Sequence, residues 1–130
     1  MYGFDYSTNI IHSLKLWLQY FLPLLHLILQ QTEKRIEYIV FDKILPNPIK
    51  KHVMEGAKLA KEESCDFVIG LGGGSSIDSA KSIALMAKHY GDYWDYIVGG
   101  TGKGKAPVNG ALPIVAITTT AGTGTEADPW

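Results

Sequence analysis

Cysteine is almost absent from this sequence of 130 residues, and neither sign of charge is in excess. The single cysteine, Cys65, has no partner for a disulfide within the chain, which fits the reducing cytoplasm where we expect the protein to work. The 12 Lys and Arg residues are balanced by 13 Asp and Glu residues, so the formal net charge is −1. This balance excludes the strongly basic surface typical of nucleic-acid binding, and we expect no nucleic-acid partner.

Glycine is missing between Gly3 and Gly56, although the whole sequence contains 14 glycines. This front part carries a leucine-rich run from Leu14 to Leu29, which is broken by polar residues and a proline: Lys15, Gln19, Pro23 and His26. A membrane span needs about 20 mostly apolar residues. We therefore expect an apolar helix kinked at Pro23 and no membrane partner.

We interpret residues 1–34 as an anomalous leucine-rich segment and residues 35–130 as an incomplete nucleotide-binding α/β domain. Residues 14–34 are predicted to be frame-shifted or foreign to the fold. Translating the coding DNA in the other two frames tests this, because a strand and a glycine turn should then appear. If neither frame restores them, the segment is a real divergence.

Strands and helices alternate in the pattern of the remaining sequence. Apolar runs rich in β-formers predict strands at residues 36–41, 67–71 and 112–117. Charged residues surround Val53, Ala57 and Ala60 in a predicted surface helix over residues 49–63, and a second helix is expected to end at Gly91 as its C-cap. Such alternation predicts an α/β fold with a parallel sheet. The run at 67–71 is typical of a strand covered on both faces.

Three consecutive glycines, Gly72, Gly73 and Gly74, connect the strand at residues 67–71 to the second helix. Without Cβ atoms the turn lets a ligand reach the backbone, and the free N–H groups of a helix N-terminus suit a phosphate. The pyrophosphate of a dinucleotide is the expected occupant. A turn that only joins a strand to a helix is the alternative. The spacing excludes a G-x-G-x-x-G motif and a P-loop.

Serines follow the glycine turn, and we expect Ser75 or Ser76 to cap the helix, with Asp78 as the acid of a capping box. The strand at residues 112–117 opens onto a hydroxyl-rich loop, residues 118–126. Because parallel strands end at one sheet edge, this loop is expected beside the glycine turn, where it could line the phosphate and ribose groove. A polar turn without a ligand is the alternative.

Four ordered motifs carry a resemblance to a known family: Pro46-Asn47-Pro48, the stretch from Gly72 to Lys81, the stretch from Gly91 to Asp95, and the stretch from Thr119 to Glu126. Over about residues 35–127 the chain resembles the N-terminal, cofactor-binding half of the iron-containing (group III) alcohol dehydrogenases, especially the butanol-dehydrogenase-like members. The resemblance implies a Rossmann-like dinucleotide-binding domain that uses NAD or NADP.

The resemblance also implies which residues bind the cofactor. Gly73, Gly74 and Ser75 would hold the pyrophosphate, and Asp78 matches the acid that follows the turn. The full implied set is Asn47, Gly72, Gly73, Gly74, Ser75, Asp78, Thr119, Thr120 and Thr123.

In this family a divalent metal, iron or zinc, binds to an aspartate and histidines of a helical C-terminal domain, and none of those positions is matched here. Asp128 does not correspond to the ligand aspartate. We therefore expect no catalytic and no metal-binding residue in this chain, which we interpret as a truncated, inactive part of the enzyme. Full-length members transfer hydride between a small alcohol or aldehyde and nicotinamide, and a homo-oligomer is compatible with the resemblance.

Two alternatives stay open at this point. One is a fragment of a relative with the same glycine turn, a glycerol dehydrogenase or dehydroquinate synthase. The other is a nucleotide-binding module without catalysis.

Overall fold

A computed structural model describes residues 37–45 and 49–127 of the chain. The chain divides into two compact units, residues 1–40 and residues 41–130, and the fold below is that of the second unit. Its elements are α2 (Lys50–Glu62), β1 (Val68–Gly72), α3 (Gly74–Ala87), the 3-10 helix η1 (Tyr93–Tyr96) and β2 (Ile114–Thr118).

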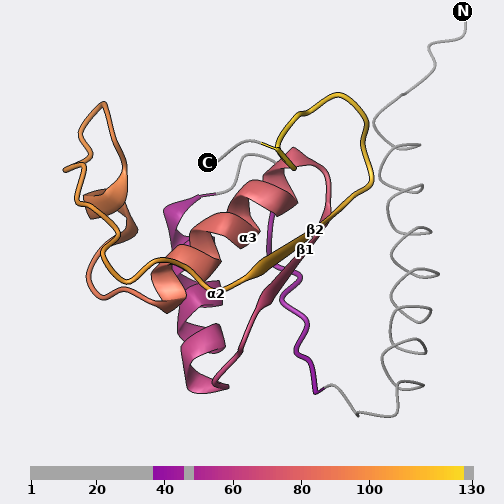
Figure 1. Cartoon of the computed structure of the whole chain (residues 1–130), viewed down its shortest axis with the longest axis horizontal. Coiled ribbons are helices and arrows are strands. Elements are labelled where there is room, and N and C mark those ends of the chain that lie inside the picture. Colours follow the sequence, from indigo (N-terminus) through magenta and orange to yellow (C-terminus); the bar gives the residue numbers. More distant parts are fainter. Residues whose placement is uncertain (1–36, 46–48, 128–130) are drawn as a thin grey trace, which may run out of the picture. The chain divides into compact units, whose positions relative to one another are not determined.

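The two strands pair in parallel, from Val68 opposite Ile114 to Gly72 opposite Thr118. Between them the chain runs through α3, which packs against both strands and against α2 (Figure 1). A parallel pair connected through a helix is the βαβ unit of α/β proteins. The predicted α/β fold with a parallel sheet is therefore confirmed.

α2 buries the side that its sequence pattern predicts. Val53, Ala57 and Ala60 lie in the core with Ile83 and Met86 of α3. The charged residues of α2 lie on its other sides, where Lys51 and Lys58 are exposed. The small residues between the two helices allow close packing, and a Cβ on Gly56 would lie 2.5 Å from Ile83 Cδ1.

The C-terminal end of α2 forms a Schellman motif. The N–H of Cys65 donates to the Ala60 carbonyl at 2.9 Å, and the N–H of Ser64 donates to that of Lys61 at 3.1 Å. This motif requires a left-handed residue after the helix, a conformation that glycine adopts most easily. Ser64 occupies that position with φ 54° and is the one non-glycine residue at positive φ in the described ranges.

Replacing Ser64 by glycine is therefore expected to stabilise the fold by about 0.5–1 kcal/mol, because the strain of a Cβ in the left-handed region is removed. Urea denaturation followed by circular dichroism measures the change. Glu63→Gly is the matched control, since Glu63 has φ −94° and glycine there is expected to destabilise. A midpoint for Ser64→Gly at or below that of the unchanged protein would contradict the prediction.

The start and end of α3 differ from the sequence-based expectation. Its N-cap is Gly73, with an extended backbone and no capping side chain, so the predicted caps Ser75 and Ser76 are wrong. Because the helix begins at Gly74, both serines already lie in its first turn, and Asp78 lies beyond the capping-box position. At the other end the helix stops at Ala87, with Lys88 as the cap in place of Gly91. The Lys88 N–H closes the last turn on the Leu85 carbonyl at 3.1 Å.

The core face of α3 consists of small and apolar residues. Ile77, Ala80, Ile83 and Ala84 are buried, together with Ser79 and Met86, and Ala87 is half-buried. The Ser79 hydroxyl is satisfied within the helix, because it donates to the Ser75 carbonyl at 2.7 Å.

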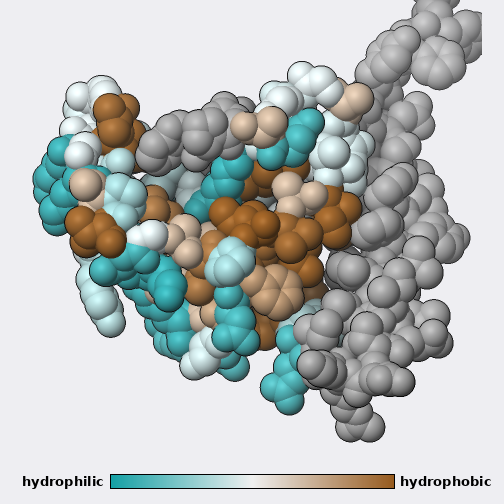
Figure 2. Space-filling view, in the orientation of Figure 1, coloured by the Kyte–Doolittle hydropathy of each residue, from teal (hydrophilic) through white to brown (hydrophobic). Residues whose placement is uncertain are grey.

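The strands are less buried than expected. Within β1 only Gly70 is buried, and Phe67 just before it is 40% exposed, so the prediction of a strand covered on both faces is wrong for the described residues. In β2, Val115 is 48% exposed. Figure 2 shows hydrophobic side chains at the surface in the region where Figure 1 draws β2. The reason is that α3 is the described helix that packs extensively on this strand pair, whereas α2 packs mainly against α3.

The strand predicted at residues 36–41 is not formed by its described part. Residues 37–41 have neither helical nor strand structure, because a strand is defined by pairing and the described sheet consists of β1 and β2 alone. Ile36 lies outside the described residues, as do the predicted kinked helix at Leu14–Leu29 and the predicted boundary between residues 34 and 35. None of the described helices has the length and apolar character that a membrane span requires.

The glycine-rich loop over residues 99–110 is largely exposed, yet backbone hydrogen bonds connect its first half to η1. The N–H groups of Gly104 and Lys105 donate to the carbonyls of Ile97 and Asp95 at 3.0 Å and 2.8 Å. Hydrogen bonds from the ammonium groups of Lys103 and Lys105 hold the pKa of Asp95 below its ordinary value. These interactions place the loop beside η1.

Candidate cofactor-binding site

The glycine turn begins where β1 ends, at the carboxyl edge of the strand pair. Gly72 has φ 143°, a backbone conformation that residues with a side chain rarely adopt. A Cβ at this position would lie 2.6 Å from Ser76 Oγ. Its carbonyl accepts a hydrogen bond from the Thr119 N–H at 2.9 Å. The glycine turn and the threonine loop, residues 119–127, are thereby joined at their first residues, as predicted from their place after parallel strands.

The next two glycines face the threonine loop at close range. A Cβ on Gly73 would lie 3.3 Å from Thr120 Oγ1, and a Cβ on Gly74 would lie 3.0 Å from Thr125 Oγ1 and 3.6 Å from Thr123 Cβ. Figure 1 shows this loop, in yellow, arching from β2 back to the first turn of α3. Glycine at both positions therefore leaves a space between the helix start and the threonine side chains that a Cβ would fill.

The first turn of α3 offers hydrogen-bond donors to this space. The carbonyl of Gly73 accepts from the N–H groups of Ser76 and Ile77 at 3.0 Å and 3.1 Å. The N–H groups of Gly74 and Ser75 have no such acceptor within residues 37–45 and 49–127, as expected for the first residues of a helix. Together with the positive end of the helix dipole they form a place where an anion is stabilised.

Asp78 lies further along α3. Its carboxylate forms an ion pair with Lys81, with 3.6 Å between Oδ1 and Nζ, and Oδ1 has no hydrogen-bond partner within the described ranges. Oδ1 is buried, whereas the Asp78 side chain as a whole is 48% exposed.

The structure brings together six of the residues predicted from the sequence: Gly72, Gly73, Gly74, Thr119, Thr120 and Thr123. Ser75 adds a backbone donor in the first turn of α3. Asn47 lies outside the described residues, and its role stays a prediction, as do the individual roles of the others.

One residue of this region was missing from the predicted set. Thr125 is 8% exposed, whereas Thr119, Thr120 and Thr123 are exposed, and its hydroxyl is the atom closest to the Cβ position of Gly74. The sequence contains the signal, because Thr125 follows Thr123 across a glycine in the same loop. Its burial against the helix start depends on the tertiary structure.

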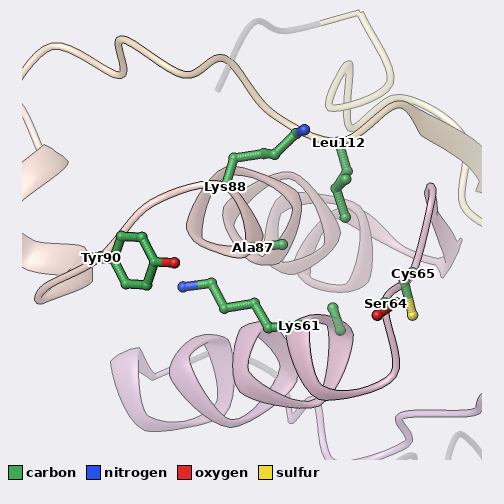
Figure 3. Close-up of a pocket in the computed structure, with 8 residues that line it drawn as sticks. Lys61, Ser64, Cys65, Ala87, Lys88, Tyr90 and Leu112 are labelled. Atoms are coloured by element: carbon green, nitrogen blue, oxygen red, sulfur yellow. The ribbon is translucent and has the colours of Figure 1, made fainter.

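A cavity of about 370 Å³ lies away from this edge, beside the C-terminal ends of α2 and α3 (Figure 3). Residues including Lys61, Cys65 and Lys88 line it, and none of the predicted cofactor residues does. In Figure 3 the Lys61 side chain extends toward Tyr90, whose ring lies 4.7 Å from Nζ. We therefore place the candidate site at the glycine turn.

The His, Cys, Asp and Glu side chains of the described ranges do not gather at one place. Within residues 37–45 and 49–127 there is no cluster of three His, Cys, Asp or Glu side chains that could hold a metal ion. No step through a metal is therefore assigned to these residues.

A parallel strand that passes through a glycine turn into a helix N-terminus, beside a second strand end rich in hydroxyl groups, defines a dinucleotide-binding domain of Rossmann-like type. The sequence model of the iron-containing alcohol dehydrogenases matches residues 18–130, and the chain belongs to this family. The match begins within residues 1–34, whose anomalous character stays a prediction that the coding DNA can test.

Three relatives show the extent of the similarity. The NAD-dependent methanol dehydrogenase of Bacillus methanolicus is 44% identical over 94 residues, which are 72% of this chain and 23% of that protein. The crystal structure of NADH-dependent butanol dehydrogenase A from Thermotoga maritima is 37% identical with a TM-score of 0.62, covering 69% of this chain and 21% of that one. Sulfoacetaldehyde reductase from Bifidobacterium kashiwanohense, solved with NAD+, is 38% identical with a TM-score of 0.62, covering 68% and 23%. The chain thus spans less than a quarter of the length of these relatives.

Proposed function

We propose that this chain supplies the cofactor-binding part of an NAD(P)-dependent alcohol dehydrogenase, which transfers hydride between a primary alcohol or aldehyde and nicotinamide. The observation that carries the proposal is the space between the first turn of α3 and the threonine loop, where a Cβ on Gly74 would meet Thr125 Oγ1 at 3.0 Å. The relatives named for NAD or solved with it support a nicotinamide dinucleotide as the occupant.

The chain's own groups explain how such a cofactor would be held. The N–H groups of Gly74 and Ser75 and the dipole of α3 would bind the pyrophosphate, because both favour negative charge at a helix N-terminus. The threonine hydroxyls and the half-exposed carboxylate of Asp78 would hydrogen-bond the parts of the cofactor beside the pyrophosphate. When bound, the nicotinamide ring supplies the hydride chemistry, and the protein's contribution here is binding and orientation.

The 130-residue chain is expected to bind NADH or NADPH weakly and to oxidise no alcohol by itself. The groups that meet at the site are backbone N–H groups, hydroxyls and one carboxylate, which suit phosphate and ribose. Calorimetric titration of the folded chain with both cofactors measures binding. Assays with butanol and propane-1,2-diol, in the presence of iron, zinc or nickel, measure turnover.

Two outcomes would contradict these expectations separately. A folded chain that binds neither cofactor at millimolar concentration would contradict the cofactor site. Alcohol oxidation above the protein-free control, lost on Gly74→Val, would show that the chain builds an active site of its own.

A further inference from the structure

Thr125 differs from the other hydroxyl residues of the threonine loop in its burial. It is 8% exposed and is one of three buried polar residues in the described ranges, the others being Ser79 and His89. Ser79 donates to the Ser75 carbonyl, and both ring nitrogens of His89 have hydrogen-bond partners, Leu85 and Asn109. Thr125 has no hydrogen-bond partner within residues 37–45 and 49–127.

The position of the Thr125 hydroxyl indicates what it could bind. Its oxygen lies 3.0 Å from the Cβ position of Gly74, and Cβ bonds in a helix tilt toward the N-terminus. The hydroxyl therefore lies on the N-terminal side of the first turn of α3, where the N–H groups of Gly74 and Ser75 are available to an anion. Gly122 and Gly124, with φ 85° and 69°, provide the turns that bring the loop back to this point.

We infer that Thr125 is a further cofactor-binding residue, whose hydroxyl donates a hydrogen bond to the diphosphate of the dinucleotide at the N-terminus of α3. Thr125 is largely buried as a residue and its hydroxyl has no protein partner in the described ranges, so a phosphate oxygen at the helix N-terminus would supply an acceptor in a charge-assisted hydrogen bond. This inference rests on the proposed function and adds to it a threonine that was not in the set predicted from the sequence. It also gives a second reason for glycine at position 74, because a side chain there would displace the hydroxyl.

The test uses two substitutions of the 130-residue chain and two ligands that share the diphosphate, NADH and ADP. Thr125→Val keeps the shape of the side chain and removes the hydroxyl, whereas Thr125→Ser keeps the hydroxyl. In calorimetric titrations we expect Thr125→Val to lower the affinity for NADH and for ADP by roughly tenfold or more. This is the effect of losing a hydrogen bond to a charged group. Thr125→Ser should stay within about threefold of the unchanged chain, well under the 1.4 kcal/mol that a tenfold change represents.

The outcomes separate this inference from the proposed function. If the unchanged chain binds both ligands and Thr125→Val binds them equally well, the hydroxyl contact is wrong while the cofactor site stands. Equal losses of affinity in Thr125→Val and Thr125→Ser would show that the side chain only packs. A loss of affinity for NADH but not for ADP would show that the hydroxyl contacts another part of the cofactor. Either result would overturn the inference. If the unchanged chain, folded by circular dichroism, binds neither ligand, the proposed function fails and this contact fails with it.

Discussion

Replacing Gly74 by valine is expected to abolish NADH binding without unfolding the protein. The new Cβ would lie 3.0 Å from Thr125 Oγ1 and 3.6 Å from Thr123 Cβ, and the two added methyl groups would fill the space between α3 and the threonine loop. The pyrophosphate would lose that space together with its approach to the backbone N–H groups. We expect affinity to fall by about 100-fold or more, which corresponds to about 3 kcal/mol.

The fold should tolerate this change because Gly74 is already the first residue of a helix. Valine has a somewhat better helix propensity than glycine, which offsets part of the crowding at the threonine loop. Calorimetric titration with NADH measures the affinity, and thermal melting by circular dichroism checks the fold. NADH binding by a folded Gly74→Val protein at the affinity of the unchanged chain would contradict the site.

Ser75→Ala is the matched control for this substitution. Because α3 has no side-chain cap, loss of the Ser75 hydroxyl should change stability little. The backbone N–H at position 75 stays in place, so any loss of NADH affinity should stay near that of one hydrogen bond, about 1 kcal/mol.

Replacing Gly70 by valine is expected to destabilise the fold strongly. Gly70 is the buried residue of β1 and lies where the strand crosses α3. A Cβ at this position would lie 2.9 Å from Ala80 Cβ and 3.3 Å from Ile77 Cα. The Ile77 atom belongs to the backbone, so a change of rotamer cannot relieve the contact, and the strand and helix would have to separate.

Overpacking of this kind typically costs about 1–3 kcal/mol, and we expect Gly70→Val to lie at the upper end. Urea denaturation measures the free energy of unfolding. Ala111→Val is the matched control, since it adds methyl groups at an exposed position before β2 and should change stability by less than about 0.5 kcal/mol. Equal stability of the two variants would show that β1 and α3 are not packed as closely as described.

The elements of the second unit could be predicted because local patterns and tertiary packing agree. The helical spacing of the small and apolar residues Val53, Ala57 and Ala60 predicted a helix with the correct buried side. The apolar runs that end near Gly72 and Thr118 predicted the two strands. The meeting of the glycine turn and the threonine loop was also predictable, because parallel strands end at a common edge.

Other predictions failed because the structure at those positions depends on residues that are distant in the sequence. The β-formers at residues 37–41 predict a strand, yet strand structure needs a neighbour to pair with. Serine is a residue type common at N-caps, which suggested Ser75 and Ser76. The N-cap is instead Gly73, two residues before Ser75, because Gly73 itself adopts the extended cap conformation. The prediction that β1 is buried on both faces failed for the same reason, because burial depends on which elements pack against the sheet.

The sequence by itself determined the two helices and two strands of the second unit, their parallel pairing, the glycine turn and the family resemblance, because each follows from local residue spacing. Only the tertiary structure decided the burial of Thr125 and the need for glycine at position 70. Both depend on contacts between segments far apart in the chain: Thr125 on the first turn of α3, and Gly70 on the backbone of the same helix. The type of a residue does not reveal its distance to a segment far away in the sequence, because the close packing of the folded protein sets that distance.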